Sequence, residues 1–101
     1  MSVLITIKFA VSGETMQKVA VDNAALMTTI IDDGRRHGTI HHQFVQDPDG
    51  SAVVVDEWPD EDSFHRFFDA QQDIRTIMER AGVTEPPEVR IYPVLETPDR
   101  F

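Results

Sequence analysis

The alternation of apolar and polar residues predicts β-strands near both ends of the chain. Residues 3–9, VLITIKF, are rich in β-branched side chains and put Val, Ile and Phe side chains on one face, as a half-buried strand requires. Residues 88–94, EVRIYPV, follow an extended Pro-Pro linker and predict a last strand. Pro93 has no backbone N–H to donate, so it is expected near the end of that strand or at a sheet edge.

A β-hairpin is predicted in the middle of the chain. Residues 39–45 and 51–58 both have strand-like patterns, and the sequence Asp47-Pro48-Asp49-Gly50 lies between them. Proline presets φ, and glycine accepts the positive φ that closes a hairpin. The two segments are therefore expected to pair as antiparallel neighbours.

Two helical regions are predicted between the strands. Apolar residues recur at near-helical spacing between Thr15 and His37, with an expected break near Asp22 and Asn23, whose side chains compete for backbone hydrogen bonds. Because Pro59 stops the preceding strand and Asp60 can cap a helix, the second region is expected to begin at about Glu61. Gly82 suits the position that ends it, and the region is expected to be two short helices or one bent helix.

This order of elements predicts a ferredoxin-like α+β unit, βαββαβ, with helices on one face of a four-stranded antiparallel sheet. We expect a single domain over residues 1–95 and a polar tail over residues 96–101. The uncovered sheet face is expected to be apolar enough to bind a second sheet, which predicts a homodimer. The apolar residues expected there are Leu4, Val45, Val54, Trp58, Tyr92 and Val94, diluted by the charged residues Lys8, Asp56 and Arg90.

Composition narrows the classes of partner. The 101 residues are 41% hydrophobic, enough for a core, and they include no cysteine, which excludes disulfides and thiol chemistry. The formal net charge of −9 would repel phosphate backbones, so nucleic acid is not an expected partner. Neither a leader peptide nor a membrane-spanning stretch is evident, so the expectation is a soluble cytoplasmic protein without a membrane partner.

The segment VVVDEWPDEDSFHRFF, residues 53–68, together with the element order, resembles the dimeric α+β barrel superfamily. The similarity is greatest to the small proteins that resemble antibiotic biosynthesis monooxygenases. It implies two sheets that pack face to face and a small-molecule pocket in each subunit between sheet and helices. Known members oxidise aromatic polyketides without a cofactor, degrade haem, isomerise or dehydrate small ligands, or show no chemistry, so the fold alone supports a pocket more than a reaction.

Haem degradation is the weaker of these interpretations. Trp58 and His65 look similar to residues of the haem-degrading branch, but the first strand offers Thr6 where that branch has an asparagine. No cofactor is therefore expected. A metal site is not expected either, because His41 and His42 are adjacent on a strand and point to opposite faces.

The hairpin register decides which polar side chains meet. A four-residue loop over residues 47–50 pairs Gln46 with Ser51 and sets His41 opposite Asp56, a sensible acid–base pair. A one-residue bulge at Gly50 would change these neighbours. In the four-residue register one sheet face carries Ile40, His42, Phe44, Val53, Val55 and Glu57, and the other carries Thr39, His41, Gln43, Val45, Val54, Asp56 and Trp58. Hydrophobicity points the first face at the helices, whereas the resemblance, through Trp58, points the second into the pocket.

Both sets therefore supply candidate site residues. The catalytic candidates are His41, His42 and Asp56, and the candidates for substrate binding are Trp58, His65, Phe68 and Tyr92. Each also has a structural interpretation: a cross-strand polar pair, a core histidine, an aromatic plug or a surface residue. The first functional hypothesis is a cofactor-independent or substrate-assisted enzyme acting on a small aromatic or polyketide-like molecule. The alternative is a non-enzymatic homodimeric module that binds a ligand or another protein.

Overall fold

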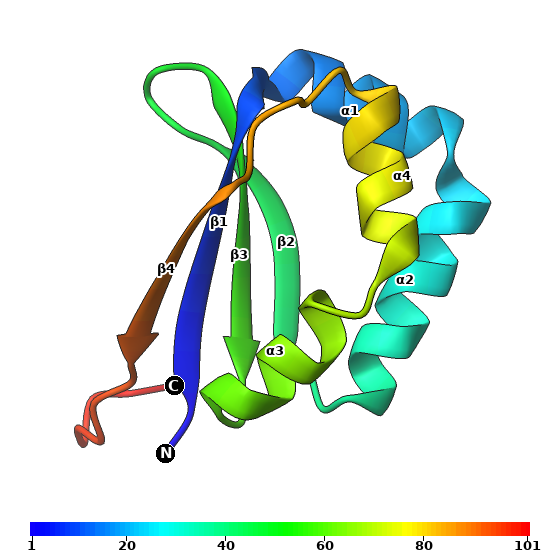
Figure 1. Cartoon of the computed structure of the whole chain (residues 1–101). Helices are drawn as coiled ribbons and strands as arrows, with labels where there is room; N and C mark the ends of the chain where they lie inside the picture. The colour runs from blue at the N-terminus through cyan, green and yellow to red at the C-terminus, as the bar shows by residue number, and fades with distance from the viewer.

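The structure, a computed structural model, describes residues 1–101 and contains one antiparallel sheet of four strands in the order β2-β3-β1-β4 (Figure 1). The two central strands come from opposite halves of the chain, so the sheet can form only when the halves meet. The predicted ferredoxin-like α+β fold is confirmed. The strands are β1 (Val3–Ser12), β2 (His41–Gln46), β3 (Ser51–Trp58) and β4 (Glu88–Pro93).

All four helices lie on one side of the sheet, and the other side is bare (Figure 1). The expected break in the first helical region falls at Asn23, whose side-chain amide donates to Val19 O. The Asp60 carboxylate accepts the Ser63 backbone N–H and so begins the helix at Glu61, as predicted. The helices are α1 (Gly13–Asp22), α2 (Ala24–Arg36), α3 (Glu61–Phe68) and α4 (Gln72–Arg80), and none is long and apolar enough to cross a membrane.

The core forms where alternate residues of β1 and β3 meet the helices. Ile5 and Trp58 are fully buried, and the Trp58 ring lies 5.4 Å from that of Phe67 and 5.8 Å from that of Phe64, centroid to centroid. These phenylalanines are three apart on α3, so one face of the helix holds both against the tryptophan. The end of β3 is thereby fixed against α3, which positions the last residues of that strand.

The hairpin between β2 and β3 has a different register from the one expected. Gln46 pairs with Ala52, because the Asp47 N–H donates to Ser51 O at 2.9 Å and the Gly50 N–H donates to Asp47 O at 2.8 Å. Gly50 has φ +92°, which a glycine adopts readily. The loop proper is thus three residues, 48–50, closed by a turn and a glycine bulge instead of a four-residue loop.

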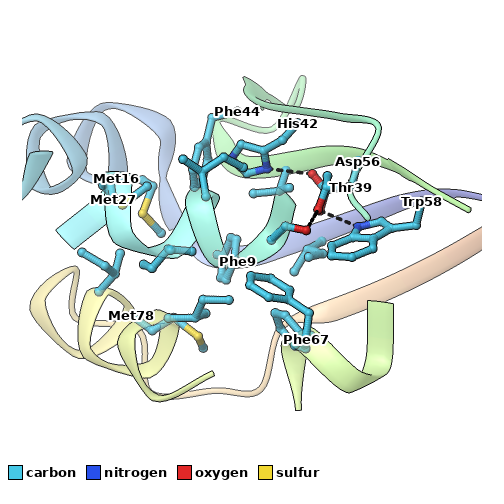
Figure 2. Close-up of a pocket in the computed structure, with 18 residues that line it drawn as sticks. Phe9, Met16, Met27, Thr39, His42, Phe44, Asp56, Trp58, Phe67 and Met78 are labelled. Atoms are coloured by element: carbon cyan, nitrogen blue, oxygen red, sulfur yellow. Dashed lines mark hydrogen bonds and ion pairs between the residues drawn. The ribbon is translucent and has the colours of Figure 1, made fainter. Parts of the chain in front are cut away.

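This difference of one residue moves every partner on β2. The predicted pairing of His41 with Asp56 is wrong: His42 lies opposite Asp56, and His41 lies opposite Glu57. His42 therefore shares a face with Asp56 and Trp58, on the helix side of the sheet (Figure 2). The alternation within each strand was predicted correctly, but the residues of each β2 face were assigned to the wrong face of β3.

The bare face is also less apolar than expected. Val54 and Trp58 were expected there together with Asp56, but all three point into the helix-covered core. Leu4, Val45 and Tyr92 remain partly exposed, at 36%, 41% and 45% of their surface. Lys8 crosses from β1 to the hairpin turn and forms an ion pair with Asp49 at 2.7 Å.

Candidate functional site

A small apolar cavity of about 70 Å³ lies between the sheet and the helices (Figure 2). Its walls come from the inner faces of β1, β2 and β3 and from all four helices, with only a few polar side chains. Methionines gather at one end of the cavity, and Asp56 and Trp58 lie at the opposite end. Side chains labelled in Figure 2 that line it are Phe9, Met16, Met27, Thr39, His42, Phe44, Asp56, Trp58, Phe67 and Met78.

The polar end is built around the buried carboxylate of Asp56. His42 Nδ1 lies 2.7 Å from Asp56 Oδ1, and the Trp58 indole Nε1–H donates to Asp56 Oδ2 at 3.2 Å. Each carboxylate oxygen thus has a donor, which a buried carboxylate requires. The Asp56 side chain is 6% exposed and that of His42 is 29% exposed, so the imidazole stands between the buried carboxylate and the outside.

This arrangement selects one form of the histidine ring. A carboxylate only accepts hydrogen bonds, so the hydrogen between the two groups belongs to Nδ1 of His42. In the neutral ring Nε2 then carries a lone pair and can accept a proton. A carboxylate that orients an imidazole in this way is the arrangement of a general base. The trio of His42, Asp56 and Trp58 is called the polar trio below.

Among the candidates for catalysis or binding, the structure brings His42, Asp56, Trp58 and Phe68 together around the cavity. His41 lies on the outer side of β2, away from the cavity and from Asp56. Tyr92, on β4, pairs with Leu4 and faces outward, so it cannot reach the cavity. The resulting site is smaller than the one expected from the sequence.

His65 is the remaining candidate, and it does not line the cavity. Its imidazole lies on α3 between two carboxylates of the same helix surface, 3.2 Å from Glu61 and 3.6 Å from Asp69. Those contacts are ordinary i, i+4 pairs on the outer side of α3. No three His, Asp or Glu side chains are arranged to hold a metal ion.

Phe44 and the methionines were not foreseen as site residues. Phe44 on β2 and Met16 on α1 line both the inner cavity and a second depression of about 400 Å³ between α1 and β2. Phe44 is 37% exposed, and its ring lies 5.8 Å from that of His42, edge on. Periodicity could not single out these residues, because it does not distinguish a core wall from a cavity wall.

Comparisons with known proteins agree on the fold. No protein-family model matches the sequence, and no curated protein matches it. Solved structures match over almost the whole chain. The chain has the fold of the antibiotic biosynthesis monooxygenases. The monooxygenase-like fold predicted from residues 53–68 and from the element order is thereby confirmed.

Three of these structures show the extent of the similarity. ActVA-Orf6 of Streptomyces coelicolor, a monooxygenase in complex with the ligand nanaomycin D, is 18% identical with a TM-score of 0.65, covering 95% of this chain and 90% of that one. A mutant form of SnoaB of Streptomyces nogalater, a cofactor-independent oxygenase, is 17% identical with a TM-score of 0.62, covering 98% of both chains. A protein from Caulobacter crescentus assigned to the antibiotic biosynthesis monooxygenases is 13% identical with a TM-score of 0.66, covering 94% and 91%.

Proposed function

We propose that this protein is a monooxygenase-like enzyme that acts on a small aromatic or polyketide-like substrate without a bound cofactor, with His42 as its general base. The observation that carries the proposal is the polar trio at one end of an apolar cavity, with His42 Nδ1 2.7 Å from Asp56 Oδ1. An apolar chamber with a few convergent polar groups is the usual form of a small-molecule site. The similarity in fold to a cofactor-independent oxygenase supports the same interpretation.

The proposed chemistry begins with proton removal. His42 Nε2 takes a proton from a substrate methylene that is flanked by aromatic rings or a carbonyl group. The electron pair left on carbon forms a C–O bond with dioxygen, and the proton on His42 passes to the peroxide oxygen. Loss of water from the hydroperoxide then leaves a carbonyl, so that CH₂ and O₂ become C=O and H₂O. Asp56 stabilises the charged imidazole during the first step.

The size of the cavity bears on how a substrate enters. A cavity of about 150 Å³ holds benzene, whereas the cavity here is about 70 Å³. A ring can enter only if lining side chains move, and methionines adapt readily because they are unbranched and flexible. Rotation of Phe44 would join the cavity to the depression of about 400 Å³ between α1 and β2. The joined space would fall in the range of about 300–1,000 Å³ that is typical of ligand sites.

The test is oxidation of anthrone, whose methylene lies between two aromatic rings, followed with an oxygen electrode and by the appearance of anthraquinone. His42→Gln should reduce kcat by about 100-fold or more, since general base catalysis contributes about 10²–10⁴-fold. His65→Gln, which changes a partly exposed histidine outside the cavity, should leave kcat unchanged. Equal loss in both variants, or none in His42→Gln, would reject His42 as the base.

A second copy of the chain is part of the proposal. Leu4, Val45 and Tyr92 expose apolar surface on the side of the sheet that no helix covers (Figure 1). Packing this face against its equivalent would remove that surface from water at about 25 cal/mol per Å² buried. The homodimer therefore brings two sheets face to face and leaves each cavity in its own subunit. Nucleic acid is not a proposed partner of a chain with net charge −9.

The alternative is a non-enzymatic homodimeric module that binds a small molecule or a partner. It needs the cavity but not the orientation of the imidazole. Trp58 is the single tryptophan and lines the cavity, so its fluorescence reports occupancy directly. If anthrone-like ligands change this fluorescence equally in the wild type and in His42→Gln while neither oxidises them, the binding module is the better description.

A further inference from the structure

Arg35 differs from the other arginines of the chain in having no polar partner. It lies near the end of α2 and forms neither a side-chain hydrogen bond nor an ion pair. Every other arginine contacts an oxygen atom: Arg36 that of Asp33, Arg66 of Ser63, Arg75 of Asp69, Arg80 of Asn23, Arg90 of Glu88 and Arg100 of Glu57. Arg35 is exposed, so its guanidinium is free to contact a ligand.

His41 is unpaired in the same way. The other histidines each contact a carboxylate, whereas His41 has no side-chain partner. Glu57 lies opposite His41 across the hairpin, but its carboxylate accepts from Ser2 Oγ at 2.8 Å and pairs with Arg100 at 2.5 Å. The nearest acidic residue on β3 is thus already engaged, and it leaves His41 free.

Arg35 and His41 line the same depression, of about 210 Å³, between the end of α2 and the start of the edge strand β2. We call this depression the basic pocket. None of its lining residues is acidic, and three of them are basic: Arg35 from α2, and His41 and His42 from the two faces of the edge strand β2. The lining residues are Ile31, Arg35, Thr39, Ile40, His41 and His42.

The basic pocket also borders the inner cavity. Ile31, Thr39 and His42 line both spaces, so these three side chains form the wall between them. His42 presents Nδ1 to Asp56, and no protein group occupies Nε2. A ligand that reaches from one space to the other must therefore pass directly beside this imidazole.

We propose that the basic pocket binds the carboxylate of a small aromatic acid whose ring points toward the inner cavity. The guanidinium of Arg35 matches the two oxygens of a carboxylate in a planar, bidentate contact. His41 supplies a further N–H donor, and Ile31 and Ile40 offer apolar surface for the edge of the ring. This assignment rests on the proposed function, since it makes an acidic aromatic the substrate that His42 would deprotonate.

The test compares benzoate with its neutral analogue benzamide. Binding to the full chain is measured by calorimetry and by Trp58 fluorescence, in the wild type, Arg35→Gln and Arg36→Gln. The two arginines are neighbours on α2, but Arg36 is paired with Asp33 and lies outside the basic pocket. Arg35→Gln should weaken benzoate binding about tenfold, equivalent to about 1.4 kcal/mol, and leave benzamide binding unchanged. Arg36→Gln should change neither, and His41→Gln should weaken benzoate selectively.

The outcomes separate this inference from the proposed function. Benzoate binding that is equal to that of benzamide, or insensitive to Arg35→Gln, would overturn the inference even if anthrone is oxidised. Arg35-dependent binding of benzoate without oxidation of any substrate would retain the basic pocket and reject the enzyme. Inorganic phosphate is the third probe: if it binds through Arg35 while benzoate does not, the assignment to an aromatic acid is wrong.

Discussion

His42 and Asp56 lie directly opposite each other on β2 and β3, and their side chains meet at 2.7 Å on the helix-covered face of the sheet. Because the carboxylate is buried and also holds the Trp58 indole, it cannot turn away from the imidazole without leaving that N–H unpaired. The geometry of the proposed base, His42, therefore depends on the packing of β3 against α3. Predictions about the site follow from this dependence.

Asp56→Asn should reverse the polarity of the contact. The asparagine NH₂ donates to His42 Nδ1 and moves the ring hydrogen to Nε2, where it blocks proton removal. We expect kcat to fall by about 10²–10⁴-fold, which is the usual contribution of general base catalysis. The ring form can be read independently of activity from the ¹⁵N chemical shifts of His42. Glu57→Gln, the neighbouring change on the outer face, is the control, and unchanged shifts in Asp56→Asn would contradict the assignment.

Phe44→Ala should open the cavity toward the depression between α1 and β2. The phenylalanine lines both spaces, so its removal joins them and should admit larger aromatic ligands than the wild type binds. Because the side chain is partly exposed and stacks on Phe9 at 6.4 Å, the loss of stability should be moderate, about 1–3 kcal/mol.

The wider ligand acceptance of Phe44→Ala is measured by the dependence of binding on ligand size, and its loss of stability is measured by urea unfolding. Gln43→Ala, the preceding residue on β2, lies on the opposite face and lines neither space, so it should leave the size preference unchanged. A size preference identical to that of the wild type in Phe44→Ala would show that ligands enter elsewhere.

Tyr92→Asp should disrupt the proposed homodimer. A carboxylate in the middle of an apolar contact between sheets would be buried without a partner, which is strongly unfavourable. Light scattering should give about twice the chain mass of 11.5 kDa for the wild type and a single chain for the variant. Val21→Asp replaces an exposed residue on α1, on the helix side of the sheet and not on its bare face, and should remain dimeric. A monomeric wild type at working concentrations would reject the dimer.

Asp60 should make part of the stability dependent on pH. The backbone N–H of Ser63 donates to its carboxylate at 2.7 Å and lowers the pKa of Asp60 in the folded chain. Its contribution is therefore complete above the ordinary aspartate pKa of about 3.9 and is lost as the pH falls through the lower, folded value. Asp60→Asn keeps a capping acceptor that does not titrate, so its urea midpoint should fall less on acidification.

Asp62→Asn removes a carboxylate from the same turn of α3 without touching the cap, and it serves as the control. If both variants lose stability between about pH 5 and pH 2 as steeply as the wild type does, the cap makes no contribution to the acid sensitivity.

The elements were predictable because each carries its own local signal. The strand over residues 51–58 and the helix start at Glu61 follow from alternation, a proline stop and a cap, and the structure has both at those residues. The break at Asn23 follows from a side chain that binds the backbone. Each of these signals depends only on residues that are close together in the sequence, so the sequence alone is enough to identify it.

The site was only half predictable, because it depends on how two strands align. The apolar pattern of β2 predicted that His42 and Phe44 face the helices, and the resemblance predicted that the Trp58 face of β3 lines the cavity. The structure agrees with both predictions. The conflict arose from a hairpin loop assumed to be one residue longer. Asp47-Pro48-Asp49-Gly50 suits either a four-residue loop or a turn with a glycine bulge, and the choice depends on contacts that come from elsewhere, including Lys8 of β1.

The alignment of this hairpin gives its tip an influence that surface loops rarely have. Lys8 donates to the Asp49 carboxylate and lowers its pKa, and the Ser51 N–H donates to the same side chain at 2.8 Å, so the bulged form is anchored to the sheet. Loop tips usually tolerate inserted or deleted residues. Here, one residue more or fewer in the loop would turn His42 outward and bring His41 to the cavity. The length of the loop thus selects which imidazole faces inward at the far end of the strand.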